Sequence, residues 1–153
     1  MVEDKAHSTL FGALTQSLLS EGLGFRFRAR GRSMQPTIQD EEILHVRPVA
    51  VETLRKGDIV LFADGLNYKA HRLLWIDPAQ GTFVACGDAG AVTDGAVDTG
   101  KIAGLVVAKE ENFGEQVRVV PLKGRCVRLK FLARKARARS ARFLRDVRVL
   151  RGS

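Results

Sequence analysis

Short apolar runs separated by glycine, aspartate and proline recur between residues 25 and 122, and they limit the folds that this chain can adopt. The first run, Phe25–Arg30, alternates strictly between apolar residues and arginine, as a strand with one buried face does. Further strands are expected at residues 43–49, 54–63, 68–76, 82–87, 101–110 and 116–122. Strands this short, joined by turns, predict a mainly β domain rather than a parallel α/β sheet.

A helical segment is expected ahead of this β-rich domain. Apolar positions at helical spacing predict an amphipathic helix over residues 7–21, and Gly22 lies where the helix should end. The expected core-facing residues of this helix are Leu10, Phe11, Leu14 and Leu18. The chain of 153 residues is thus divided into an N-terminal helical segment at 1–24, a β-rich domain at 25–122 and a C-terminal segment at 123–153.

The C-terminal segment carries the positive charge of the chain. Residues 1–122 contain 13 lysines and arginines against 16 acidic residues, whereas residues 123–153 contain 12 against 1. Apolar residues recur there every three or four positions, which predicts a basic amphipathic helix from about residue 127 to 150. This helix either packs its stripe on the domain or makes peripheral contact with an anionic membrane or an acidic partner. Nucleic acid is the least favoured partner, because Phe131 and Phe143 do not interleave with a basic groove.

The sequence predicts neither a transmembrane segment nor a secretory signal. The apolar stretch that begins at Leu10 is interrupted by polar residues, and a span needs about 20 mostly apolar ones. The start of the chain is acidic and lacks the basic region of a signal peptide. Cys86 and Cys126 have neither zinc nor disulfide spacing, so both are interpreted as buried, reduced thiols. We therefore expect a cytoplasmic protein that is at most peripheral at a membrane.

A serine in a glycine-preceded turn is the first candidate for chemistry. Ser33 lies in Gly31-Arg-Ser-Met34, where its hydroxyl would be exposed while Met34 packs beneath it. Such a serine is more often a simple turn residue, and it becomes a nucleophile only beside a base. The expected oxyanion donor is the backbone N–H of Ser33, helped by the region of Arg32 or Gly31.

A base and two acids follow in the chain. His71 lies in the predicted strand 68–76, and Asp88 and Asp94 come after the apolar run Thr82–Gly87. Histidine suits proton transfer near neutral pH, although a strand histidine is often only a core residue. Lys69 shares a strand face with His71 and is kept as an alternative base.

Other acidic residues are assigned no catalytic role. Asp40 and Asp58 are interpreted as turn formers, because both lie where a turn precedes a strand. The sequence contains no ligand spacing for a metal and no glycine-rich loop that opens a helix, so no cofactor is expected.

Four separated blocks resemble the signal peptidase family, in its Ser/His branch typified by the endoplasmic-reticulum, archaeal and sporulation-type enzymes. The blocks are GRSMQPTI, RKGDIVLF, AHRL and GDAGAVTD, in the order that the family shows. The resemblance implies that Ser33 is the nucleophile and His71 the general base, with Asp88 and Asp94 at the two acidic positions. Ala89 and Gly90 replace two asparagines of the family's acidic block, which leaves open the acid that orients His71. The SOS-repressor peptidases share the fold that the resemblance implies, but use a lysine base.

The resemblance implies a serine endopeptidase that cleaves an extended leader or precursor peptide. A sheet edge near Ser33 would pair with the substrate backbone, and a small apolar pocket would select small side chains. Two alternatives remain at this stage: a non-catalytic peptide-binding or docking module that retains the fold, and a self-cleaving regulator of the SOS-repressor type.

Overall fold

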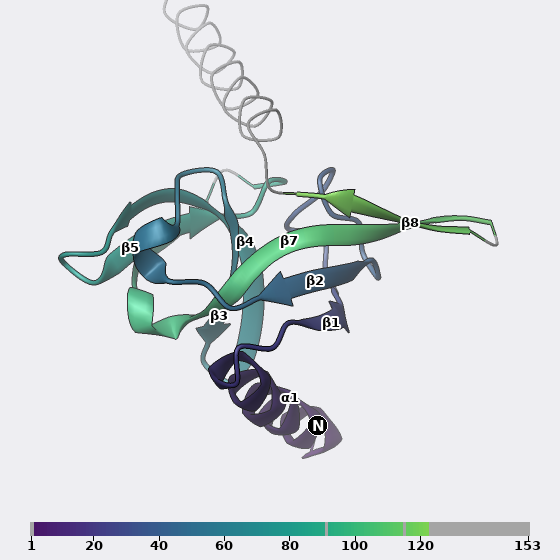
Figure 1. The fold of residues 1–153 in the computed structure, drawn as a ribbon, viewed down its shortest axis with the longest axis horizontal. Helices are drawn as coiled ribbons and strands as arrows, with labels where there is room; N and C mark the ends of the chain where they lie inside the picture. The colour runs from purple at the N-terminus through teal and green to yellow at the C-terminus, as the bar shows by residue number, and fades with distance from the viewer. Residues whose placement is uncertain (1, 91, 115, 123–153) are drawn as a thin grey trace, which may run out of the picture.

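The computed structural model describes residues 2–90, 92–114 and 116–122, and the helix predicted within 123–153 lies outside them. A strongly curved sheet dominates this part of the chain, with one helix, α1, packed beside it (Figure 1). The elements are α1 (Val2–Ser20), β1 (Phe25–Arg28), β2 (Ile43–Arg47), η1 (Val51–Thr53), β3 (Ile59–Asp64), β4 (Asn67–Asp77), β5 (Thr82–Cys86), β6 (Thr93–Asp98), η2 (Thr99–Lys101), β7 (Ile102–Phe113) and β8 (Gln116–Pro121).

The strands form an 8-stranded sheet whose order is β1-β2-β7-β3-β4-β5-β6, with β8 paired to β7. All of these pairings are antiparallel. The expectation of a mainly β domain without a parallel sheet is therefore confirmed. Register shifts interrupt four of the pairings, and β-bulges of this kind bend and twist a sheet.

One strand was not expected from the sequence. Residues 93–98 read TDGAVD, with a glycine and too few apolar residues for a strand pattern, yet they form β6. The strand exists because β5 supplies its ladder, with Cys86 opposite Thr93 and Val84 opposite Ala96. Pairing with a buried neighbour thus overrides the weak local preference, as is common for strands.

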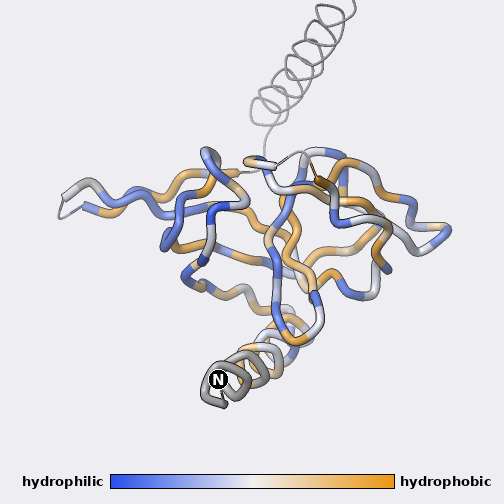
Figure 2. Tube along the Cα trace, turned by 180° about the vertical axis from the view of Figure 1, so that it is seen from behind, coloured by the Kyte–Doolittle hydropathy of each residue, from blue (hydrophilic) through white to orange (hydrophobic). Residues whose placement is uncertain are grey.

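The sheet encloses core residues on both faces of β3. Ile59 and Leu61 point into one apolar cluster, whereas Val60 and Phe62 point into a second one. Alternate residues of a strand face opposite sides, so β3 is buried on both. In Figure 2 the hydrophobic segments run along the strands, and the hydrophilic ones gather toward the outlying turns.

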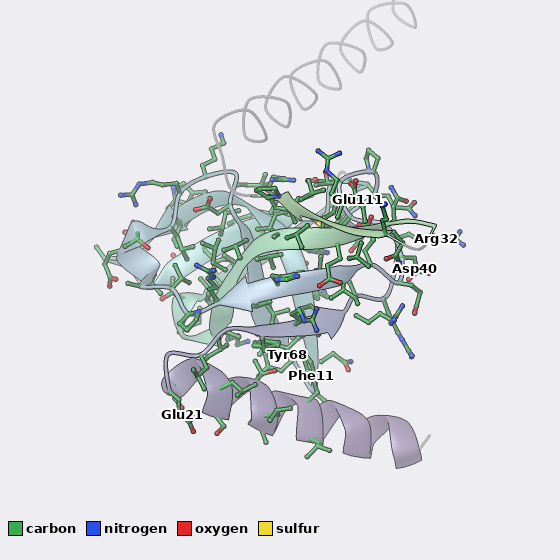
Figure 3. All side chains as sticks on the ribbon, turned by 45° about the vertical axis from the view of Figure 1, so that its right-hand side comes forward. Phe11, Glu21, Arg32, Asp40, Tyr68 and Glu111 are labelled. Atoms are coloured by element: carbon green, nitrogen blue, oxygen red, sulfur yellow. The ribbon has the colours of Figure 1, made fainter. Side chains whose placement is uncertain are left out.

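Helix α1 packs through part of the predicted face: Phe11 contacts the sheet as expected and Leu18 is half-buried, but the two other predicted leucines are exposed. Leu10 and Leu14 are 69% and 56% exposed, whereas Thr15 is buried. The helix is held by Phe11, whose ring makes edge contacts with the sheet residues Phe25, Phe27 and Tyr68 at 5.6 to 6.2 Å between centroids. Figure 3 shows Phe11 and Tyr68 facing each other between the helix and the sheet. Aromatic rings bury more area than leucine and pair edge to face, which explains why Phe11 sets the packing face.

The helix also begins earlier than predicted, at Val2, and Gly22 follows its end with a positive φ of 75°. Glutamate, lysine and alanine are residue types that favour a helix, and all three occur in the first residues of the chain. No helix in the described part of the chain is long and apolar enough to cross a membrane.

Candidate active site

The segment between β1 and β2 presents Ser33 at the surface because its neighbours are anchored. Met34 and Ile38 are 5% and 3% exposed and belong to the apolar cluster on one side of the sheet. Burying a side chain of this kind contributes about 1.5 to 3 kcal/mol, so the two residues hold the turn against the domain. Ser33 itself is exposed.

The start of this turn is fixed by Gly31 and Asp40. Gly31 has a φ of 105°, a conformation that glycine adopts readily and other residues rarely do. Its backbone N–H donates to the Asp40 carboxylate at 2.8 Å. Asp40, expected to be only a turn former, thus ties together the two ends of the segment that carries Ser33. Arg32 and Asp40 lie at the same end of the molecule in Figure 3.

Strand β4 brings His71 to Ser33. The ring atom Nε2 lies 3.0 Å from Ser33 Oγ, and His71 and Ser33 are 38 positions apart in the chain. His71 pairs with Val60 of β3 in the ladder, and its ring meets the edge of Phe62 at 6.2 Å between centroids. The contact expected between serine and histidine is therefore present, with the ring held by a buried strand and an aromatic neighbour.

Asp94, at the start of β6, lies on the other side of the ring. Its Oδ2 atom is 2.6 Å from His71 Nδ1, and both side chains are 11% exposed. A carboxylate can only accept, so the proton of a neutral ring belongs on Nδ1, which leaves Nε2 to accept the Ser33 hydroxyl proton. The three side chains therefore form a row in which Ser33 donates to His71 and His71 donates to Asp94.

Asp88 has a separate set of contacts, to Arg72 and Thr37. Arg72 donates from Nε to Asp88 Oδ1 at 2.9 Å and from Nη2 to Oδ2 at 2.7 Å, and both side chains are 1% exposed. Thr37 donates its hydroxyl to Oδ2 at 2.5 Å. Of the two acids proposed from the sequence, the structure brings Asp94 to His71 and places Asp88 in a buried ion pair that reaches the segment carrying Ser33.

The backbone of Gly87–Ala89 packs against the backbone of Ser33. Ala89 donates its N–H to the Ser33 carbonyl at 2.9 Å. A Cβ atom on Gly87 would lie about 2.4 Å from that same oxygen, a distance that real contacts do not reach. Only glycine fits at position 87 without displacing the serine turn.

Lys69 shares a strand face with His71, as its spacing predicts, but its amine is directed to carboxylates. Its Nζ lies 2.7 Å from Asp64 Oδ2 and 3.5 Å from Asp94 Oδ1. The Asp64 hydrogen bond is the largest influence that raises the pKa of Lys69, and Lys69 in turn lowers the pKa of Asp64. Within the described residues Lys69 makes no hydrogen bond to Ser33, so the geometry does not favour it as the base.

A pocket of about 480 Å³ opens beside Asp94, between the ends of β3 and β4 and strand β6. Its wall includes Phe62, Val97 and Lys101 in addition to Asp64, Lys69 and Asp94. Within the described residues no group of three histidine, cysteine or acidic side chains is placed to hold a metal ion. Cys86 is buried, as expected, and Cys126 lies outside the described residues.

The turn also supplies a candidate donor for an oxyanion. Among the described residues, no acceptor is found for the backbone N–H of Ser33, which leaves it open to a ligand. The N–H of Gly31, considered as a helper, is instead engaged with Asp40. Ser33 N–H is thus the donor that this turn offers next to the Ser33 hydroxyl.

Sequence reasoning did not identify several residues that build the site, namely Thr37, Asp40, Arg72 and Gly87. The alternation of side chains along β4 could have indicated one of them, because Arg72 follows His71 and must face the opposite side of the strand.

A comparison with models of known protein families found no match, and a search of curated proteins found no similar sequence.

Proposed function

We propose that this protein is a serine endopeptidase of the signal-peptidase type, with the fold that this family implies. The observation that carries the proposal is the row of hydrogen bonds from Ser33 through His71 to Asp94. A nucleophile in contact with a base that is itself oriented by a third group is the arrangement that identifies nucleophilic catalysis. The four blocks that resemble the family supply all three of these residues.

In the proposed reaction, His71 Nε2 accepts the Ser33 proton while Ser33 Oγ attacks the scissile carbonyl. Asp94 holds the ring in the required tautomer and stabilises the imidazolium that forms. The N–H of Ser33 donates to the developing oxyanion, and His71 then returns the proton to the leaving amine. Water, activated by the same histidine, hydrolyses the acyl-enzyme and restores Ser33.

The proposed substrate is an extended leader or precursor peptide. Strand β1 lies at one end of the sheet order, and the chain runs from it directly into the serine turn. An extended peptide that adds to such an edge gains main-chain hydrogen bonds over its length and is delivered beside Ser33. Selection of small side chains next to the cleaved bond is what the family resemblance implies.

Covalent labelling with a fluorophosphonate probe tests the proposal. We expect one adduct, located at Ser33 by mass spectrometry, with labelling slowed at least about 100-fold in His71→Gln because the general base is lost. Ser20→Ala is the matched control, since Ser20 is an exposed serine whose hydroxyl donates to a helix carbonyl. Absence of labelling in the native protein, or equal labelling in His71→Gln, would favour the non-catalytic docking module.

A further inference from the structure

Lys69 occupies a place beside the catalytic row that the proposed reaction does not use. Asp94 has two oxygens, and they serve different neighbours. Oδ2 lies 2.6 Å from His71 Nδ1, whereas Oδ1 lies 3.5 Å from Lys69 Nζ. Lys69 in turn lies 2.7 Å from Asp64, so charges of alternating sign lead from the surface to the histidine.

We propose that Lys69 is a positioning residue of this peptidase, which holds the outer oxygen of Asp94 and opposes protonation of the His71 ring. The inference rests on the proposed function, because only a general base has to be unprotonated when the substrate binds. A carboxylate held at both oxygens has less freedom to rotate away from Nδ1. The lysine charge also offsets part of the negative charge of Asp94, which by itself favours a protonated ring.

Asp64 has the opposite effect in this arrangement. It neutralises Lys69 from the solvent side, and the two side chains are 52% and 42% exposed. Removal of the lysine charge leaves two carboxylates near His71, which favours the imidazolium. Removal of the Asp64 charge leaves the lysine uncompensated, which favours the neutral ring. The two substitutions are therefore expected to act with opposite sign.

Four other charged residues lie near His71 and Asp94, two in the pocket and two on the other face of β4. Lys101 of η2 and Asp98 of β6 line the same pocket, where Asp98 accepts from the Gly100 N–H. On the other face of β4, Arg72 and Asp88 are buried together and offset each other's charge. Lys101 has no ion pair among the described residues, so it offers a comparison of equal charge in the same pocket without the contact to Asp94.

NMR titration of the histidine rings in the whole protein tests the inference without any substrate. The chain has three histidines, and His71→Gln identifies the relevant resonance by its loss. We expect the titration midpoint of the His71 ring to rise by about half a pH unit in Lys69→Met, as for partly solvated charges at short range. It should fall in Asp64→Asn, and it should stay near the native value in Lys69→Arg and Lys101→Met.

The acid limb of the labelling rate at Ser33 should move in the same directions as the ring titration. A midpoint that does not move in Lys69→Met, moves downward there, or moves equally in Lys101→Met would overturn the inference. Because the ring titration needs no catalysis, a protein that shows these shifts but no labelling would contradict the proposed function alone. Lys69→Arg, which keeps the charge, shows whether an effect of Lys69→Met comes from the loss of the positive charge.

Discussion

Replacement of Asp88 by asparagine is expected to unfold this domain far more readily than the same replacement at Asp94. Arg72 and Asp88 are each 1% exposed, and Arg72 makes two of its hydrogen bonds to that carboxylate. Asparagine keeps the shape but removes the charge, and it turns an amide N–H₂ toward the guanidinium donors. The arginine is then left buried without the carboxylate that offsets its positive charge.

The structure sets the size of this effect. Removing one partner of a buried ion pair costs about 3 to 5 kcal/mol, because the remaining charge cannot regain its hydration. A domain of this size loses about 4 °C of melting temperature for each kcal/mol, so Asp88→Asn should lower Tm by roughly 12 to 20 °C. Asp94 is 11% exposed and lies beside a pocket, so water replaces much of what its charge provides. Asp94→Asn should lower Tm by less than about 5 °C while it slows labelling at Ser33.

Circular dichroism melting curves of the two variants, recorded beside the native protein, measure these differences. A third variant, Asp88→Asn with Arg72→Met, should recover part of the lost stability, because it also removes the buried positive charge that Asp88 no longer offsets. The recovery is expected to be partial, since Arg72 also donates to the Gly57 carbonyl at 2.8 Å. The reasoning is refuted if Asp88→Asn melts within 4 °C of the native protein, or if Asp94→Asn melts as low as Asp88→Asn.

Two further substitutions test other contacts. Gly87→Ala would place a Cβ about 2.4 Å from the Ser33 carbonyl oxygen and so displace the serine turn. We expect labelling at Ser33 to be about 100-fold slower in this variant. The control is Gly90→Ala, whose added Cβ would have its nearest contact at 3.9 Å, and it should label at the native rate. Equal rates in the two variants would show that the turn tolerates the shift. The hydrogen bond to His45, and after it the one from Arg26, lowers the pKa of Glu110 below its ordinary value of 4.5. The stability that this carboxylate contributes is therefore present above pH 4.5 and is lost as the pH falls through the lowered pKa. Urea midpoints between pH 3 and 7 should therefore fall more steeply toward acid in the native protein than in Glu110→Gln, and parallel curves would contradict this.

The sequence predicts the mainly β architecture, because it contains many short apolar runs of strand length that are separated by turn residues. It does not predict β6, whose residues acquire strand geometry by pairing with β5. It predicts the packed face of α1 only in part, because helical spacing identifies Leu10, Leu14 and Phe11 together, whereas in the structure Phe11 packs on the sheet and the two leucines are exposed. Local patterns thus report the type of an element better than the surface it meets.

Within the candidate site, sequence predicts the residue types better than their partners. The blocks that contain Ser33 and His71 are recognisable one by one, and the structure brings the two residues into contact. The two acids could not be told apart with the same assurance, since both Asp88 and Asp94 follow one apolar strand and adjoin glycines. Gly87 illustrates the remaining gap, because nothing in the sequence indicates which distant backbone atom a glycine accommodates.

The division of labour between the two acids follows from the parity of β4. His71 and Arg72 are neighbours in the chain, so the strand turns them to opposite faces, and each takes one acid from the β5–β6 region. The ladder sets His71 opposite Val60 and Arg72 opposite Ile59. A slip by one residue would exchange the faces of the histidine and the arginine, which would take from Asp88 the buried guanidinium that offsets its charge. The buried ion pair therefore favours the register in which His71 meets Ser33, so a contact on one face of the strand helps to fix the geometry on the other.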